Sequence, residues 1–190
     1  MKRLNSVIAA ILILTPVLNA TGPDKESFGP GQAIADEIKQ FAGTDIAWIP
    51  AGMLNEEGKG DLTTYLKFGT DEIAIVSLTG KQIRLALERS VSLYPSANPS
   101  FLQISGLEVS FSKSANPDER IRTVLVDGNA LNLENKYQVA MPSTLARGGL
   151  GFFTIWDKKS IERTVEKSAL EVILKGKAGS VRTARWKMVD

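Results

Sequence analysis

Histidine and cysteine are both missing from the 190-residue chain. Without them there is no Ser-His-Asp or Cys-His nucleophile, no thiol redox pair, no disulfide, and no imidazole or thiolate ligand for zinc. A bound metal would have to be held by carboxylates and carbonyls, which suit calcium or magnesium better than transition metals. General acid and base chemistry would fall to Asp, Glu, Lys or Tyr. The main prediction is a chain with no metal site and no cofactor, while a calcium or magnesium site built from carboxylates stays open as an alternative.

The N-terminus carries a pattern that is typical of export signals. Lys2 and Arg3 precede an apolar stretch over residues 7–14, which continues to Leu18. This stretch is too short to span a bilayer as a helix. We predict a signal peptide over residues 1–20, a mature chain without a membrane span, and an exported protein that is periplasmic or extracellular.

The mature chain carries no net charge. Loss of Lys2 and Arg3 leaves 21 basic and 21 acidic side chains. Sequence-independent nucleic acid binding needs clustered Lys and Arg that displace counterions, so nucleic acid is not expected as a partner. Residues 21–30 contain Gly and Pro without periodicity, which indicates a linker. Residues 31–190 have the length of one globular domain.

Helical and strand patterns are mixed along the domain without regular alternation, which favours an α+β fold over a doubly wound α/β fold. Apolar residues recur at helical spacing over 81–91, with Thr79 as the N-cap, and Asp61 is the N-cap of a shorter helix. The apolar run over 72–78 is typical of a buried strand. The full prediction comprises helices over 32–41, 61–67, 81–91 and 161–175, and strands over 45–50, 72–78, 102–104, 107–111, 121–126, 136–141 and 181–189.

Three local features refine this prediction. The apolar parity of the chain changes at Gly106, which suggests a β-bulge. Asp127 and Gly128 form a dipeptide that is typical of a tight turn. On the last predicted helix, a basic stripe at spacing i, i+4, i+8 would comprise Lys159, Arg163 and Lys167.

The local chemical motifs are weak. Ser110 and Lys113 have the Ser-x-x-Lys spacing of some acyl enzymes, but at a strand end they would face opposite sides of the sheet. Acidic pairs that are adjacent in sequence indicate a solvated surface. Gly148, Gly149 and Gly151 allow the backbone to approach a ligand closely or to turn sharply.

Six short segments carry a resemblance to a known family. They are TDIAWI (44–49), LKFG (66–69), IVSLTGKQI (75–83), LERSV (87–91), FLQISGL (101–107) and GGLGF (148–152). In this order and spacing, over roughly residues 31–175, they resemble the C-terminal domain of secreted 5'-nucleotidases and related UDP-sugar and cyclic nucleotide hydrolases. The resemblance implies an α+β domain with a groove that recognises the nucleoside part of a nucleotide.

In that family the domain follows a larger metallophosphatase domain, which holds two metal ions through His, Asp and Asn and performs the hydrolysis. The resemblance here extends over the binding domain alone, and a chain without histidine cannot supply that ligand set. The resemblance therefore implies a relative of nucleotide-catabolic enzymes that does not hydrolyse nucleotides by itself.

The ligand contacts of the family fall on altered residues. Its loop after the first strand reads Asn-Gly-Gly-Gly-Ile-Arg, where the asparagine meets the base and the arginine helps to hold phosphate. Pro50 and Asn55 stand at these two positions, and neither offers the same hydrogen bonds. Of the two rings that enclose the base in the family, Phe68 matches one and Thr144 replaces the other. Leu150 replaces the ribose-binding aspartate.

The candidate ligand-binding residues are those that still match the family. They are Phe68, Gly52, Gly148 and Gly149. Possible substitutes for the lost contacts are Asn55 and Arg147 toward phosphate, and Phe152, Phe153 or Trp48 as a second ring. No residue is expected to be catalytic.

We expect an exported, non-catalytic binding or interaction module with a degenerate nucleotide site. One alternative is a nucleotide-binding subunit that works in trans with a separate metallophosphatase chain. Another is a metal-dependent hydrolase that uses carboxylates only. The expected partners are accordingly a nucleoside or nucleotide-like small molecule and a separate metallophosphatase chain.

Overall fold

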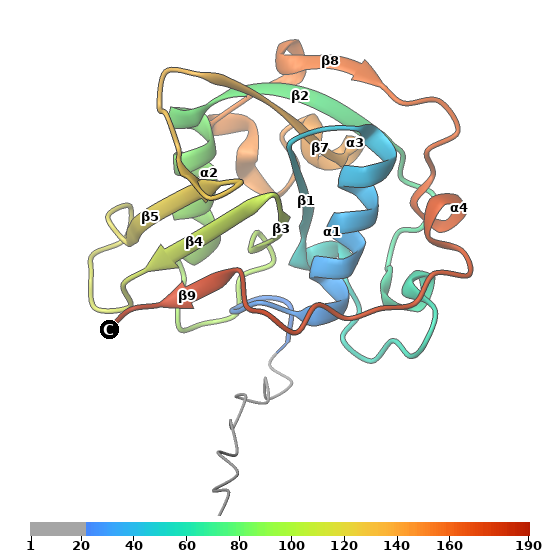
Figure 1. Cartoon of the computed structure of the whole chain (residues 1–190), viewed down its shortest axis with the longest axis horizontal. Coiled ribbons are helices and arrows are strands. Elements are labelled where there is room, and N and C mark those ends of the chain that lie inside the picture. Colours follow the sequence, from blue (N-terminus) through green and yellow to red (C-terminus); the bar gives the residue numbers. More distant parts are fainter. Residues whose placement is uncertain (1–21) are drawn as a thin grey trace, which may run out of the picture.

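The computed structural model describes residues 22–190, and the predicted signal peptide over 1–20 lies outside them (Figure 1). Within the described residues, no helix has the length and apolar character needed to cross a membrane. The chain forms two mixed β-sheets with helices packed on them. The expected α+β class is confirmed.

The elements alternate irregularly along the chain. The α-helices are α1 (Gly29–Ala42), α2 (Gly80–Val91), α3 (Ser143–Ala146) and α4 (Leu170–Leu174). The strands are β1 (Ile46–Pro50), β2 (Ile73–Thr79), β3 (Leu102–Ser105), β4 (Leu107–Phe111), β5 (Ile121–Val126), β6 (Asn129–Ala130), β7 (Lys136–Pro142), β8 (Ile161–Thr164) and β9 (Trp186–Met188). Short 3-10 helices are η1 (Ala51–Met53), η2 (Leu62–Tyr65), η3 (Gly149–Thr154) and η4 (Lys158–Ser160).

The larger sheet has five strands in the order β3-β1-β7-β2-β8. Its β1 and β7 run parallel, and its other neighbouring strands run antiparallel. The smaller sheet has the order β6-β5-β4-β9, in which β9 pairs parallel with β4. The strand expected over 181–189 is therefore shorter than predicted, since β9 covers only its last part.

The central strands β1 and β2 of the larger sheet are buried on both faces. Ile46 and Trp48 of β1 belong to one hydrophobic cluster, which includes α2 and apolar side chains of the smaller sheet. Ala47 and Ile49 belong to the other cluster, which includes α1. In Figure 1, α1 lies across β1. Continuous apolar runs in β1 and β2 follow from this arrangement, because both faces of these strands are covered.

Gly106 marks the point at which the chain passes from one sheet to the other. Its φ is 77°, and a Cβ atom there would overlap the carbonyl oxygen of Asp45. Strand β3 ends just before it in the larger sheet, and β4 begins just after it in the smaller one. The predicted β-bulge is therefore wrong, since the change in apolar parity comes from a corner between two sheets.

Helix α2 begins with the predicted cap and connects the two sheets. The Thr79 hydroxyl accepts a hydrogen bond from Gln82 N, and the Gln82 side chain accepts one from Thr79 N. Glu88 of this helix is buried although it is a charged residue. Its two carboxylate oxygens accept from the backbone N–H groups of Arg120 and Ile121, both at 2.9 Å. Glu88 thus joins α2 to β5.

Two predictions at turns are confirmed. Asp127 and Gly128 have φ values of 45° and 79° and connect β5 to β6. The Asp61 carboxylate accepts hydrogen bonds from the side chain and the backbone N–H of Thr63, which lower the pKa of Asp61. The capped segment is the 3-10 helix η2, shorter than the helix expected over 61–67.

The predicted helix over 161–175 is wrong. Its first part is the edge strand β8, which pairs with β2, and only α4 near its end is helical. Backbone pairing with β2 overrides the helical spacing of the apolar residues. Lys167, between the two elements, has a φ of 56°. Lys159, Arg163 and Lys167 therefore form no helical stripe.

Residues 22–30, which were expected to form a linker, are part of the folded domain. Helix α1 already begins at Gly29. Upstream of it, the side-chain nitrogen of Gln103 in β3 donates to the carbonyl oxygens of Pro23 and Glu26, at 2.8 Å each. This segment is part of the folded domain because a buried side chain holds its backbone.

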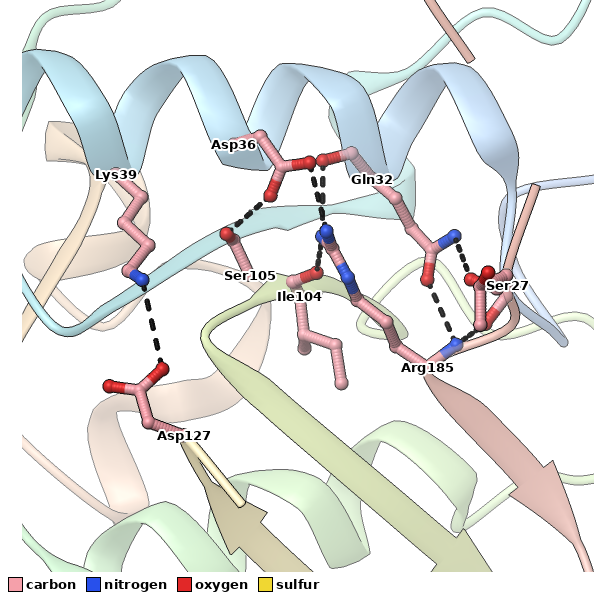
Figure 2. A network of polar contacts seen from close by, with 9 residues as sticks. Ser27, Gln32, Asp36, Lys39, Ile104, Ser105, Asp127 and Arg185 are labelled. Atoms are coloured by element: carbon pink, nitrogen blue, oxygen red, sulfur yellow. Dashed lines mark hydrogen bonds and ion pairs between the residues drawn. The ribbon is translucent and has the colours of Figure 1, made fainter. Parts of the chain in front are cut away.

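Arg185 ties the C-terminal segment to α1 and β3 (Figure 2). Its guanidinium donates to the Asp36 carboxylate at 2.8 Å and to the carbonyl oxygens of Ile104 at 2.7 Å and Gln32 at 3.4 Å. Its backbone N–H donates to the Ser27 hydroxyl at 3.0 Å and to the Gln32 side-chain oxygen at 3.1 Å. One residue thus holds the N-terminal segment, a helix and a strand together.

We expect Arg185→Met to lower the free energy of unfolding by about 2–4 kcal/mol, because it removes the ion pair with the partly buried Asp36 carboxylate and the hydrogen bonds to two carbonyl oxygens. Lys187→Met is the matched control. Lys187 forms an exposed ion pair with Glu108, whose loss costs less than about 1 kcal/mol. Urea denaturation measures both changes. Equal destabilisation by the two substitutions would contradict this role of Arg185.

Candidate functional site

A cavity of about 530 Å³, here called the Phe68 cavity, lies at one edge of the larger sheet. This volume is typical of small-molecule sites. Its walls come from the end of β1, the segment ahead of β2, α3 and the glycine loop formed by residues 148–152. The lining residues are Pro50, Gly52, Met53, Phe68, Thr70, Asp71, Thr144, Leu145, Gly149 and Leu150.

Strand pairing brings these segments to one edge of the sheet. Because β1 and β7 run parallel, their last residues, Pro50 and Pro142, lie at the same edge. Because β2 runs antiparallel to β7, its first residue, Ile73, lies opposite Pro142. The segment that carries Phe68 and Asp71 therefore reaches the sheet where β1 and β7 end.

Phe68 stands on the cavity wall with 59% of its surface exposed. A ring this exposed is available for stacking against a planar ligand. Gly52 and Gly149 also line the cavity, whereas Gly148 is not among its lining residues and forms a turn with a φ of 88°. Three positions that the resemblance relates to ligand contacts also line this cavity. They are Pro50 at the base position, Leu150 at the ribose position and Thr144 at the position of the second ring.

The glycine loop is held through the carbonyl oxygen of Leu150. This oxygen accepts hydrogen bonds from Arg89 Nε at 3.1 Å, Arg89 Nη2 at 2.5 Å and the Ser100 hydroxyl at 3.0 Å. Leu150 has a φ of 55°, in the left-handed region that is costly for leucine. A Cβ atom at Gly151 would overlap the Arg89 guanidinium. The loop is thus positioned by backbone contacts and not by the Leu150 side chain.

The aromatic residues considered as a second ring lie outside the cavity lining. Phe152 is fully buried and stacks on Trp156 with 4.8 Å between ring centroids. Trp48 is also fully buried and packs against Trp156 at 5.9 Å. Phe153 is 69% exposed but is not a lining residue. In the described part of the chain, Phe68 is therefore the one aromatic residue that lines this cavity.

The side chains considered for phosphate also lie apart from Phe68. Arg147 is exposed and does not line the cavity. Asn55 lines a neighbouring cavity of about 310 Å³, and its side-chain oxygen accepts a hydrogen bond from Glu57 N at 3.2 Å. The two cavities share Gly52.

The neighbouring cavity, here called the acidic cavity, carries three carboxylates and one ammonium group. Its lining residues are Pro23, Asp24, Ala51, Gly52, Leu54, Asn55, Glu56, Glu57, Lys67 and Pro99. Like charges so close to a phosphate disfavour its binding. The charge around Asn55 is thus opposite in sign to what a phosphate group requires.

Within residues 22–190, no group of three or more His, Cys, Asp and Glu side chains is arranged to hold a metal ion. The carboxylates of the acidic cavity are not such a group. The alternative of a carboxylate-only metal-dependent hydrolase therefore has no candidate centre in the described part of the chain.

Four residues that shape the site were not predicted. Thr70 and Asp71 line the Phe68 cavity and directly follow Phe68-Gly69, so this motif could have drawn attention to them. Arg89 and Ser100 hold the glycine loop from a helix and a loop that are far away in sequence. No local pattern reports their contacts, because these depend on how α2 packs.

The sequence matches the family "5'-nucleotidase, C-terminal domain" over residues 16–157. This chain belongs to that family. The match includes β1, β7 and the glycine loop, and it ends before β8, α4 and β9.

Curated relatives match over part of their length. The trifunctional nucleotide phosphoesterase protein YfkN of Bacillus subtilis is 31% identical over 137 residues, which are 64% of this chain and 9% of that protein. The 5'-nucleotidase of Bos taurus is 34% identical over 107 residues, 52% of this chain and 18% of that protein. The cell wall protein Lmo0130 of Listeria monocytogenes is 33% identical over 148 residues, 68% and 18% respectively. The chain thus spans less than a fifth of each relative.

Solved structures share the fold. The 5'-nucleotidase precursor of Thermus thermophilus superposes with a TM-score of 0.70 at 26% identity, over 90% of this chain and 37% of that chain. The NAD nucleotidase NadN of Haemophilus influenzae superposes with a TM-score of 0.61 at 15% identity, over 92% and 38% respectively. Both matches cover the described fold almost entirely.

We expect Leu150→Asn to raise the free energy of unfolding by about 0.5–1 kcal/mol, because asparagine tolerates the left-handed region better than leucine. The contacts to Arg89 and Ser100 use the backbone and remain. Leu133→Asn is the control, since Leu133 is similarly exposed, at 44% against 39%, without a positive φ. Urea denaturation compares the variants, and a loss of stability at Leu150→Asn would argue against backbone strain at this residue.

Proposed function

We propose that this chain is a non-catalytic module that binds a small planar molecule in the Phe68 cavity. The observation that carries the proposal is Phe68 itself, an exposed ring on the wall of a cavity of about 530 Å³. Stacking on such a ring requires a flat face of the ligand and tolerates differences in its hydrogen-bonding groups.

Polar recognition in this cavity differs from the family pattern. The side chains of Pro50 and Leu150 offer no hydrogen bond where the resemblance implies contacts with base and ribose. A site loses much of its affinity when designed hydrogen bonds are absent. Stacking on Phe68 and burial against Met53 and Leu145 remain as the main favourable contacts, so we expect weaker binding than in a site with the family's full set.

The lack of metal-coordinating side-chain clusters among the described residues supports a module that does not hydrolyse nucleotides. Two-metal hydrolysis needs a dinuclear centre, and residues 22–190 hold no cluster of side chains suited to a metal ion. The region shared with YfkN and the bovine 5'-nucleotidase is a small part of each of those proteins, and it corresponds to the family's C-terminal domain. We therefore assign binding, and not phosphate release, to this region.

We also propose that the module acts after export. The support is the N-terminal pattern of Lys2 and Arg3 followed by the apolar residues 7–14. Mass spectrometry of the protein recovered outside the cytoplasm tests the proposal. An N-terminus near Thr21 is expected, and retention of the whole N-terminal segment would contradict it.

Phe68→Ala tests the proposed site. We expect adenosine, titrated calorimetrically, to bind the unaltered protein and to lose about 1–3 kcal/mol of binding free energy in the variant, the scale of one ring-on-ring contact. Phe153→Ala is the matched control, because Phe153 is as exposed as Phe68 but does not line the cavity. Equal losses in both variants, or none in Phe68→Ala, would contradict the proposal.

The same preparations test the absence of catalysis. With magnesium or calcium and AMP, we expect no release of phosphate above the level without protein. Sustained phosphate release that follows protein concentration through a final purification step would refute a purely binding role.

A further inference from the structure

The polar side chains of the Phe68 cavity come from two segments. Thr70 and Asp71 come from the segment ahead of β2, and Thr144 comes from α3. A hydrogen bond from Thr144 N to the Asp71 carboxylate joins the two segments. The side chains of Pro50 and Leu150, which also line the cavity, offer a ligand no hydrogen bond.

Among residues 22–190, Asp71 is the one charged residue that lines this cavity, and two hydrogen bonds hold it in place. Its side-chain oxygen Oδ2 accepts a hydrogen bond from Thr144 N at 3.2 Å. Its backbone oxygen accepts one from Leu170 N at 2.9 Å. Both bonds hold the residue from elements distant in sequence, so the carboxylate is fixed beside Phe68 and not carried on a free loop.

The second carboxylate oxygen of Asp71, Oδ1, has no hydrogen-bond partner among the described residues. An ionised carboxylate accepts hydrogen bonds at both oxygens and donates none. The oxygen that Thr144 leaves free is therefore suited to an amine or hydroxyl donor on a ligand, and a hydrogen bond to a charged acceptor is among the stronger ones.

The charges around the site disfavour an anionic ligand. None of the Lys and Arg residues that the structure describes lines the Phe68 cavity. The adjoining acidic cavity contains Asn55, which stands at the family's phosphate position. Among the described residues, the charged side chains that line it are Asp24, Glu56, Glu57 and Lys67, so its net charge is negative. A phosphate directed toward either cavity meets a net negative wall, whereas a neutral or cationic group does not.

We propose that Asp71 is the polar anchor of this cavity and that the site selects planar ligands that carry hydrogen-bond donors and no phosphate, such as a nucleoside, over the corresponding phosphomonoesters. This inference rests on the proposed binding function. It adds the class of ligand and the residue that orients it.

The first measurement compares adenosine with AMP by calorimetric titration of the unaltered protein in low-salt buffer without divalent cations. We expect AMP to bind about tenfold or more weakly than adenosine, because its phosphate faces carboxylates. The difference should narrow as salt is added, since screening weakens the repulsion. Equal affinities, or tighter binding of AMP, would overturn the inference.

The second measurement uses Asp71→Asn. The amide oxygen can still accept from Thr144 N, so the wall is preserved while the charge is removed. We expect adenosine to bind about tenfold more weakly and the difference between adenosine and AMP to shrink. Asp118→Asn is the matched control, because Asp118 is exposed in the loop between β4 and β5 of the other sheet. It should leave both affinities unchanged.

The outcomes separate this inference from the proposed function. If Phe68→Ala abolishes adenosine binding while Asp71→Asn changes nothing, or weakens adenosine and AMP by the same factor, the binding function stands and the role of Asp71 is refuted. If adenosine shows no saturable binding, or binds independently of Phe68, both are refuted.

Discussion

The parallel pairing of β1 with β7 is the constraint on which the site depends. Parallel neighbours end at the same edge of a sheet, and the antiparallel strand β2 begins there. Both faces of these strands are buried, so a shift of register by one residue would exchange the two hydrophobic clusters and is strongly disfavoured. The positions of Pro50, Phe68 and Thr144 around one cavity therefore follow from the packing of the core, and Asp71 is held in addition by its hydrogen bond from Thr144 N.

The part of the cavity formed by the glycine loop is held in another way. The glycine loop belongs to no sheet, and its position is set where Arg89 of α2 and Ser100 donate to the Leu150 carbonyl. Helix α2 itself is fixed between the two sheets by its apolar face and by the buried Glu88. The cavity thus has one wall set by strand register and one set by the placement of a helix, which makes its shape dependent on the way the two sheets pack.

The sequence predicted those elements whose burial leaves a periodic trace. The run in β2 and the capped helix α2 are examples, because two-sided burial and a single apolar face give distinct patterns. The helix predicted over 161–175 was wrong because backbone pairing with β2 outweighs the helical spacing of its apolar residues. That pairing exists only in the folded chain. At the site, the resemblance identified Phe68 and the replacements around it, while Asp71 and Arg89 were missed because their roles arise from neighbours distant in sequence.

The glycine loop also shows how the shape of the cavity can be kept when the side-chain contacts that the resemblance implies are missing. Leu150 occupies a left-handed conformation that disfavours leucine, yet the loop is retained because its anchoring oxygen belongs to the backbone. A substitution at this position that tolerates the left-handed conformation would leave the bonds from Arg89 and Ser100 in place. Likewise Pro50 keeps its place in β1 by pairing with Leu102, whatever its side chain offers a ligand. The shape of the cavity and its specificity are therefore separable, and polar groups elsewhere in the lining are free to define a different ligand.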